Sequence, residues 1–337
     1  MENLTQDKIG EMDEMADKNA LDNNQSINNK NQTIADFREL SKSLFDATQA
    51  RKKTLLIFII TVFSICLVLM VVASIWDYQI ATALNHPTAS LSWFLHYYGE
   101  WPAPFIINVG FMVVLYVYLI RTRKKGNYLF LLFLIPLAGA FVFSYFFTNG
   151  VLDITWGLAL TITIVSIGVM SLFSFLVPRE KLVKVLFFLM LCFIIANLAY
   201  FLMLFTKWLW GRVRFRDIGC VLDPGIGFTP WFRINGPNGN EAFFSGHALA
   251  ALSFTFVWMI PPIFNIKNRV AIALMYGISS FYALAMMWGR IVTGAHYLSD
   301  VTMSVIIFVS FTMLVLSFIF FRKLRKQRKL AKKEFAR

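Results

Sequence analysis

Long apolar runs are the feature that most restricts how this chain can fold. Eight stretches carry almost no charge, and each is close to the roughly 20 residues with which a helix crosses the hydrocarbon core of a bilayer. Helices pair their own backbone groups, which a bilayer requires. The expected spans are about 54–76, 103–120, 128–147, 154–177, 185–206, one that starts near Gly246 and shortens or kinks at Pro261-Pro262, 270–288 and 301–321.

Composition supports this interpretation. The 337 residues are 58% hydrophobic and only 15% charged, which excludes an ordinary soluble domain. A net charge of +13 would suggest nucleic acid in a soluble protein. Here Lys and Arg lie in short clusters between apolar runs, as in loops retained in the cytoplasm. We therefore expect an all-α integral membrane protein, a polytopic helical bundle of about eight transmembrane helices, with the lipid bilayer and not nucleic acid as its partner.

Basic clusters and tryptophans predict the orientation of this bundle. Eight spans put both termini on one side, and the inter-span basic clusters fall on that same side, which predicts an N-in, C-in topology. Tryptophans favour membrane interfaces, and six of them fall near the expected outer ends of spans: Trp76, Trp101, Trp156, Trp208, Trp210 and Trp288. Segments 207–244 and 289–300 are then expected to face outward.

The regions outside the spans divide the chain into three parts. Residues 1–50 form a polar cytoplasmic tail, in which 1–33 are predicted to be disordered. Residues 34–50 have apolar side chains at helical spacing, which predicts either an amphipathic helix on the inner membrane surface or a transient helix in a flexible tail. The transmembrane domain covers 51–321, and a basic cytoplasmic tail covers 322–337. No disulfide is expected, because only one of the three cysteines lies in an outer loop.

Charged residues are concentrated between the last two spans, in Gly-Arg-Ile-Val-Thr-Gly-Ala-His-Tyr-Leu-Ser-Asp from Gly289 to Asp300. If its second half is helical, His296 and Asp300 lie on one face, where a carboxylate can fix the tautomer of an imidazole. Arg290 offers a permanent charge with a geometry that suits phosphate. The simpler alternative is a short outer loop with a snorkelling arginine and a helix-capping aspartate.

Two further segments bring charge to the same side. Lys207, Arg212 and Arg214 lie at an outward membrane end, which a bound anion or interfacial snorkelling would explain. In Phe244-Ser-Gly-His247, Ser245 is suited to cap a helix whose free amides bind an anion; the alternative is a plain capped helix with a surface histidine. Together the segments predict a phosphate site in which one histidine, paired with Asp300, attacks phosphorus and the other protonates the leaving oxygen. No metal ligand set is visible, so we expect no metal and no cofactor.

This combination resembles the type 2 phosphatidic acid phosphatase superfamily, whose pattern is Lys-x6-Arg-Pro, Pro-Ser-Gly-His and Ser-Arg-x5-His-x3-Asp. The resemblance covers about 200–315 and reads here Lys207-x6-Arg214-Phe215, Phe244-Ser-Gly-His247 and Gly289-Arg290-x5-His296-x3-Asp300. Two phenylalanines thus replace prolines, and a glycine replaces a serine. The family core usually has six spans, three before the first motif. Five spans are expected before the first motif here, so the third and fourth spans are expected to form an extra hairpin.

The resemblance implies a role for each matching residue. His296 would be the nucleophile that forms a phosphohistidine, Asp300 would orient it, and His247 would act as general acid and then as base. The phosphate would be held by Lys207, Arg214, Arg290, Ser245 and Gly246, with Arg212 matching a less strict arginine of the first motif.

The expected function is therefore a metal-independent phosphatase of a bacterial cell membrane. Its active site faces outward, and its substrate is a lipid phosphate or a polyprenyl diphosphate. A phosphotransferase and a sugar-phosphate phosphatase are alternatives within the enzymes. A non-catalytic anion-binding, lipid-binding or transport protein is the alternative of another class. Transporters typically show internal repeats with polar sites at mid-membrane, whereas here the polar groups gather at one face.

Overall fold

The described part of the chain is helical. The computed structural model describes residues 32, 35–42, 44–46, 52–86, 88, 92, 94–95, 99–100, 102–122, 156–218 and 227–335, and these residues contain no strand. This confirms the predicted all-α class for the described part. The helices are α2 (Lys52–Leu84), α4 (Pro102–Thr122), α6 (Trp156–Leu176), α7 (Arg179–Trp210), α8 (Gly246–Leu252), α9 (Ile260–Phe264), α10 (Arg269–Val292) and α11 (Leu298–Phe335), with 3-10 turns at Phe215–Asp217 and Ser253–Met259.

Six described segments are long and apolar enough to cross a bilayer: Lys53–Leu84, Pro102–Arg121, Arg179–Asp217, Gly246–Phe264, Arg269–Val292 and Leu298–Phe318. They coincide with six of the eight expected spans, and the chain is an integral membrane protein. Helix α6 coincides with the span expected at 154–177, although its described apolar part, Ile164–Leu176, is shorter. The span expected at 128–147 and, apart from Gln32, the disorder expected for 1–33 lie outside the described residues. The count of eight and the N-in, C-in direction stay predictions.

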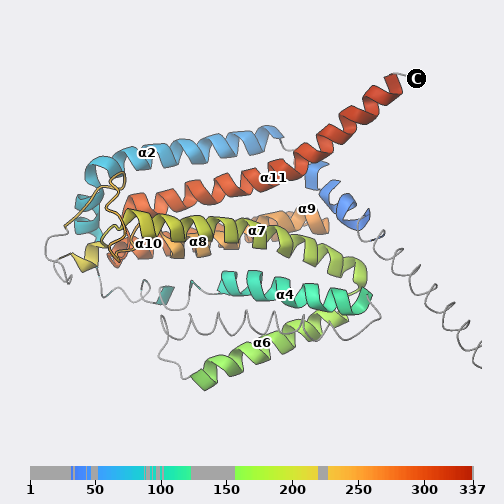
Figure 1. Cartoon of the computed structure of the whole chain (residues 1–337), viewed down its shortest axis with the longest axis horizontal. Helices are drawn as coiled ribbons and strands as arrows, with labels where there is room; N and C mark the ends of the chain where they lie inside the picture. The colour runs from blue at the N-terminus through green and yellow to red at the C-terminus, as the bar shows by residue number, and fades with distance from the viewer. Residues whose placement is uncertain are drawn as a thin grey trace, which may run out of the picture.

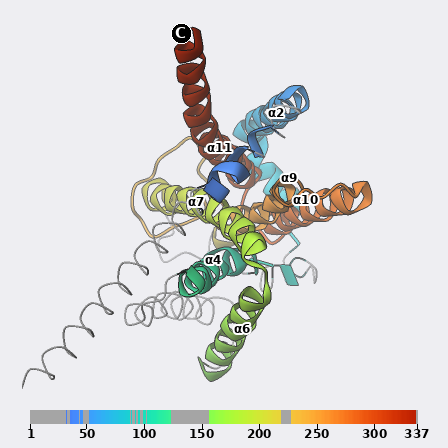
Figure 2. The ribbon, with the colours of Figure 1, turned by 90° about the vertical axis from the view of Figure 1, so that its right-hand side faces the viewer.

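Helix α7 lies at the centre of the bundle. It packs against α4 and α11, while α2 lies along α11, α10 packs against α8, and α6 covers the far side of α4 (Figures 1 and 2). Its buried side chains, which include Leu191, Cys192 and Ile195, form the core with residues of the neighbouring helices. Peripheral helices instead expose large apolar side chains, such as Leu67 of α2 and Phe281 of α10, as a lipid-facing surface requires.

The N-terminal segment packs against the start of α7. Residues 35–42 and 44–46 are helical, and Leu40, Leu44 and Phe45 are buried. The rings of Phe37 and Phe187 meet edge to face with centroids 5.7 Å apart. The apolar spacing predicted for this segment therefore corresponds to a helix packed on the bundle, whereas the sequence left a surface helix and a transient helix open.

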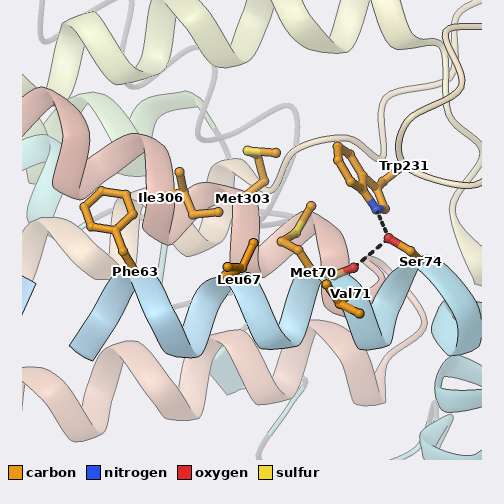
Figure 3. A pocket seen from close by; sticks show the side chains of 8 residues that line it. All are labelled: Phe63, Leu67, Met70, Val71, Ser74, Trp231, Met303 and Ile306. Atoms are coloured by element: carbon orange, nitrogen blue, oxygen red, sulfur yellow. Dashed lines mark hydrogen bonds between the residues drawn. The ribbon is translucent and has the colours of Figure 1, made fainter. Parts of the chain in front are cut away.

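An apolar groove of about 320 Å³ lies between α2 and α11 (Figure 3). It is lined by Phe63, Leu67, Met70, Val71, Ser74, Trp231, Met303 and Ile306. Trp231 belongs to the segment after α7, and its Nε1 donates to Ser74 Oγ (2.9 Å). This contact fixes that segment to α2 one turn before Asp77, a buried charged residue of the same helix.

Candidate active site

The first motif follows a sharp stop of α7 at Gly211. This residue has φ of 52°, and its N–H donates to Lys207 O (3.2 Å). A Cβ would be strained at this φ and would collide with the carbonyl oxygen of Gly236, so the turn requires glycine. The side-chain amides of Asn235 (3.3 Å) and Asn238 (2.8 Å) donate to Gly211 O. The turn thereby leads the chain from Lys207 straight into the arginines that follow.

The second motif is a helix start fastened to α11. Ser245 caps α8, as predicted, because its Oγ accepts from the N–H of Ala248 (3.2 Å). Its own N–H donates to Asp300 O (3.3 Å), and Ser304 Oγ donates to Ser245 O (2.9 Å). A Cβ on Gly246 would lie 3.3 Å from Met203 Cε, so this glycine also permits close packing on α7. The second and third motifs are thus held together by backbone contacts.

The third motif is a turn between two helices. Helix α10 ends at Val292 and α11 begins at Leu298, so His296 lies just before the helix and not inside it, whereas Asp300 lies in its first turn. Gly294 takes a φ of 65° within the turn. The N–H groups of Ala295 and His296 both donate to Arg290 O (3.1 Å each), which fixes the nucleophile candidate relative to the arginine of the same motif.

His296 is only 2% exposed, and its tautomer follows from its contact. Nδ1 lies 2.8 Å from the carbonyl oxygen of Ala242. A carbonyl only accepts, so Nδ1 carries the proton and Nε2 carries the lone pair. Burial lowers the pKa of His296 well below its ordinary value, and the charges of Arg290 and Lys207 lower it further. His296 is therefore neutral near pH 7, with Nε2 available to an electrophile.

Asp300 contacts His296 less directly than the sequence suggested. Its Oδ2 lies 3.5 Å from His296 Nδ1, farther than the oxygen of Ala242. The same Oδ2 accepts from the N–H of Tyr297 (2.9 Å) and so satisfies an amide at the start of α11. The hydrogen bond that orients the imidazole is made by Ala242, which sequence reasoning missed because a backbone carbonyl has no residue-type signature.

Arg212 is fully buried between two carboxylates. Its Nη1 donates to Asp300 Oδ1 (2.5 Å) and Ser299 Oγ (2.7 Å), and its Nη2 donates to Asp77 Oδ2 (2.8 Å). Nε donates to the carbonyl of Thr229 (2.9 Å). We call Asp77, Arg212, Ser299 and Asp300 the buried clamp. These contacts engage all three nitrogens of its guanidinium, and the phosphate contact that the sequence considered for Arg212 stays a prediction.

Asp77 is the carboxylate of the clamp that the sequence analysis did not single out. It accepts from Ser299 N (3.2 Å) and from Ser299 Oγ, so a side chain of α2 caps the start of α11. A carboxylate within an apolar run is a functional signal. The span was expected to end at Trp76, however, so Asp77 was assigned to an outer loop, whereas α2 continues to Leu84.

A second group of residues around His296 is cationic. The charges of Arg290, Lys207 and Arg214, from the first and third motifs, all act on its ring, and the ring of His247 lies 6.3 Å away between centroids. We call Lys207, Arg214, Arg290, His247 and His296 the cationic pocket. The structure therefore brings together both predicted histidines and three of the predicted cations.

Two of these cations make only loose contacts with carboxylates. Lys207 Nζ lies 3.8 Å from Glu241, and Arg214 Nη1 lies 3.9 Å from Asp217; partly exposed pairs of this kind contribute little. Arg214 Nε is buried and has no hydrogen-bond partner in the described part of the chain. A buried guanidinium donor of this kind fits the oxygen of an anion.

Glu100 is the second carboxylate that the sequence analysis missed. Its Oε2 lies 2.6 Å from His247 Nε2. Burial raises its pKa, but the charge and hydrogen bond of His247, with the charges of Arg290 and Lys207, outweigh burial and lower the pKa to about 2. Glu100 is therefore a carboxylate at neutral pH. It precedes α4 in a segment that carried no motif, which is why the sequence gave no signal for it.

The three departures from the motif pattern occupy packed positions. A Cβ on Gly289 would lie 3.6 Å from Cα and Oγ of the buried Ser92, so Ser92 fills the space beside it. Phe215 packs against Tyr78 with ring centroids 5.6 Å apart. Phe244 is buried and meets Phe243 edge to face. These residues shape the walls of the site and leave its charged groups in place.

Comparison with known families identifies one region of the chain. Residues 181–326 match the model of the PAP2 superfamily. The match runs from α7 into α11 and contains all three motifs, whereas α2, α4 and α6 lie outside it. No curated protein and no solved structure matches the chain. Within the described residues, no group of three or more His, Cys, Asp or Glu side chains could hold a metal ion.

Proposed function

The chain belongs to the PAP2 superfamily of phosphatases through residues 181–326, and from this membership we propose that it hydrolyses a lipid phosphate or a polyprenyl diphosphate at the outer membrane face. The reaction needs no metal and passes through a phosphohistidine on His296. The observation that carries this proposal is the state of His296: buried, neutral, with its lone pair on Nε2 and three cations around it.

In the first step, Nε2 of His296 attacks phosphorus and the bond to the leaving oxygen breaks. His247 gives a proton to that oxygen, so the alcohol or the shorter phosphate leaves without an unfavourable charge. Lys207, Arg214 and Arg290 bind the remaining phosphoryl oxygens, where negative charge gathers in the transition state. The backbone at Ser245 and Gly246 contributes to the same cradle.

The second step returns both histidines to their starting states. Water attacks the phosphohistidine, His247 accepts the proton of the water, and the bond between phosphorus and Nε2 breaks. While phosphorus is bound, the His296 ring carries a positive charge. The oxygen of Ala242 at 2.8 Å and the carboxylate of Asp300 at 3.5 Å from Nδ1 stabilise that charge. Asp300 thus acts mainly through its field and by holding the start of α11.

The position of the site supports a lipid substrate. Lys207 and Arg290 lie in the last turns of α7 and α10, and large apolar side chains beside them, Trp208 and Trp288, are exposed. A head group at the end of the bundle can reach the cations while its hydrocarbon tail stays in the bilayer.

The direct test is phosphate release by purified protein. The panel contains phosphatidic acid, phosphatidylglycerophosphate, a polyprenyl diphosphate and a sugar phosphate, each with and without a chelator. We expect activity on a lipid substrate that survives chelation and is lost in His296→Ala. His86→Ala is the matched control, because His86 is exposed and lies outside the site. Full activity of His296→Ala, or no release from any substrate, would refute the proposal.

The outward orientation has its own test. Arg233 is exposed in the segment between α7 and α8. In an Arg233→Cys variant that also carries Cys220→Ser, a membrane-impermeant thiol reagent applied to intact cells should label the new cysteine. The remaining cysteines, Cys66 and Cys192, are buried and serve as internal controls. Labelling only after the cells are opened would place the site on the cytoplasmic side.

A further inference from the structure

The segment between α2 and α4 sends a carboxylate into the site. Glu100 lies outside the region that matches the PAP2 superfamily, yet its Oε2 is 2.6 Å from Nε2 of His247. The backbone before it is fixed: Tyr282 Oη donates to Gly99 O (2.5 Å), and Gly99 N donates to Leu95 O (3.0 Å). A Cβ on Gly99 would collide with the side chain of Met286, so the chain runs close against α10 there.

The surroundings of His247 explain why it needs this partner. Two cations, Arg290 from α10 and Lys207 from α7, act by their charge on both Glu100 and the imidazole of His247. Arg214, the third cation of the cationic pocket, acts by its charge on the neighbouring ring of His296. A further carboxylate of the described residues, Glu241, is 58% exposed in its side chain and lies 3.8 Å from Lys207.

Each of these cations disfavours a proton on His247, and a general acid must carry a proton when the substrate arrives. A carboxylate in direct contact has the opposite effect, because it stabilises the imidazolium by charge and by hydrogen bond. Glu100 keeps its negative charge throughout the neutral range, since its pKa is lowered to about 2. It is therefore able to supply this stabilisation at every pH at which the enzyme would work.

Resting on the function proposed above, we propose that Glu100 is a positioning residue, which holds the ring of His247 and favours its protonated form, so that His247 can enter the first step as an acid. In that step the proton moves from His247 to the leaving oxygen as the bond between phosphorus and oxygen breaks. In the second step the proton of the attacking water returns to His247. Glu100 remains a carboxylate throughout and exchanges no proton.

The experiment compares kcat/KM from pH 5 to 9 for the wild type and Glu100→Gln on two substrates. One is an alkyl phosphate, whose leaving group needs a proton; the other is an aryl phosphate, whose leaving group departs without one. Loss of an adjacent opposite charge moves a titration by about one pH unit or more. For the alkyl phosphate, the alkaline limb of the Glu100→Gln profile should move down by about one unit, with a roughly tenfold loss above it. The rate near pH 5 should stay close to that of the wild type.

The aryl phosphate should show a much smaller loss, and His247→Ala should show the same preference for the aryl substrate. Glu100→Asp keeps the charge and should restore part of the alkaline activity, which also covers the case in which the glutamine variant does not fold. Glu241→Gln is the charge-matched control: it removes a carboxylate beside Lys207 that does not contact His247, and its alkaline limb should stay in place.

Three results would overturn the inference while the wild type is active. The first is an unchanged profile in Glu100→Gln. The second is an equal loss at every pH and on both substrates, which would indicate a structural role only. The third is tighter binding of inorganic phosphate with unchanged kcat, which would show that Glu100 occupies the place of the phosphate. Absence of wild-type activity on every substrate is a different outcome, because it refutes the proposed function and the inference falls with it.

Discussion

The buried clamp and the cationic pocket both adjoin His296 and use arginine in opposite ways. Arg212 and Arg214 are two residues apart, yet Arg212 contacts two aspartates at 2.5 and 2.8 Å, whereas the nearest carboxylate to Arg214 lies 3.9 Å away. Arg212 is fully buried, and Arg214 keeps 30% of its side chain exposed. The difference teaches that acidic partners on distant helices, and not residue type, decide which arginine serves structure and which can serve a ligand.

The two sites also differ in how their charge is balanced. In the clamp, two carboxylates surround one guanidinium, so its charge is satisfied before any substrate arrives. In the pocket, the cations are held apart by the fold and act on a neutral histidine. Removing a group should therefore have opposite consequences: loss of stability in the clamp, and loss of activity without loss of stability in the pocket.

The strongest test of the comparison is His296→Ala. Removal of a catalytic nucleophile costs about 10⁴-fold or more in kcat in enzymes whose residues act as a unit, and we expect a loss of that order here. Phosphate release is the measurement, and thermal unfolding in the same detergent should show a folded protein. Activity within tenfold of the wild type would remove His296 from the centre of the site.

Breaking the clamp should unfold the protein rather than only slow it. Arg212→Ala leaves two buried carboxylates without their cation, and losing one partner of a buried ion pair costs about 3–5 kcal/mol. Asp77→Asn should cost less, because its amide can still accept from Ser299. The midpoint of thermal or denaturant unfolding measures both effects. An Arg212→Ala variant as stable as the wild type would show that the clamp does not hold α2, α11 and the first motif together.

In the cationic pocket, Arg290→Lys should lower activity without lowering stability, the opposite of the effect expected in the buried clamp. This variant keeps the charge but loses the planar fork that binds two phosphate oxygens, and losing one preorganised donor costs about 10²–10³ in kcat. Stability should stay near the wild-type level, because the charge is kept and the carbonyl of residue 290 still accepts from Ala295 and His296. Parallel assays of phosphate release and unfolding provide the check. Lower stability with wild-type kcat would place Arg290 with Arg212, as a structural arginine.

The sequence predicted which motif side chains meet at the candidate site better than it predicted their partners. Residue type and motif spacing together predicted one site for five side chains, because phosphate chemistry uses cations and histidines: His247, His296, Lys207, Arg214 and Arg290. The sequence did not place Asp77 or Glu100, which lie in α2 and in the segment before α4, outside the motifs, or the carbonyl of Ala242.

The fold shows the same limit. Apolar runs located the six described spans, because their length is set by the bilayer. The ends of α2 and the turn before α11 depended on contacts between segments far apart in the chain, and for these the local pattern carried no information. His296 therefore fell outside the helix that its spacing to Asp300 suggested.

The smallest expected effect is a pH dependence of stability that originates at His296. Its pKa is lowered in the folded protein, so the unfolded chain binds a proton first as the pH falls below the ordinary value of about 6.5. The stability that the neutral ring contributes is thus present above that value and lost below it, with a limiting slope of about 1.4 kcal/mol per pH unit. Glu100 does not titrate in this window, because its lowered pKa is about 2.

Unfolding midpoints from pH 7 to 5 should therefore fall more steeply for the wild type than for His296→Ala, since the other titrating groups are common to both. Parallel curves would mean that His296 titrates normally in the folded protein, and the pocket would then lack the effect of burial and charge that separates it from the clamp.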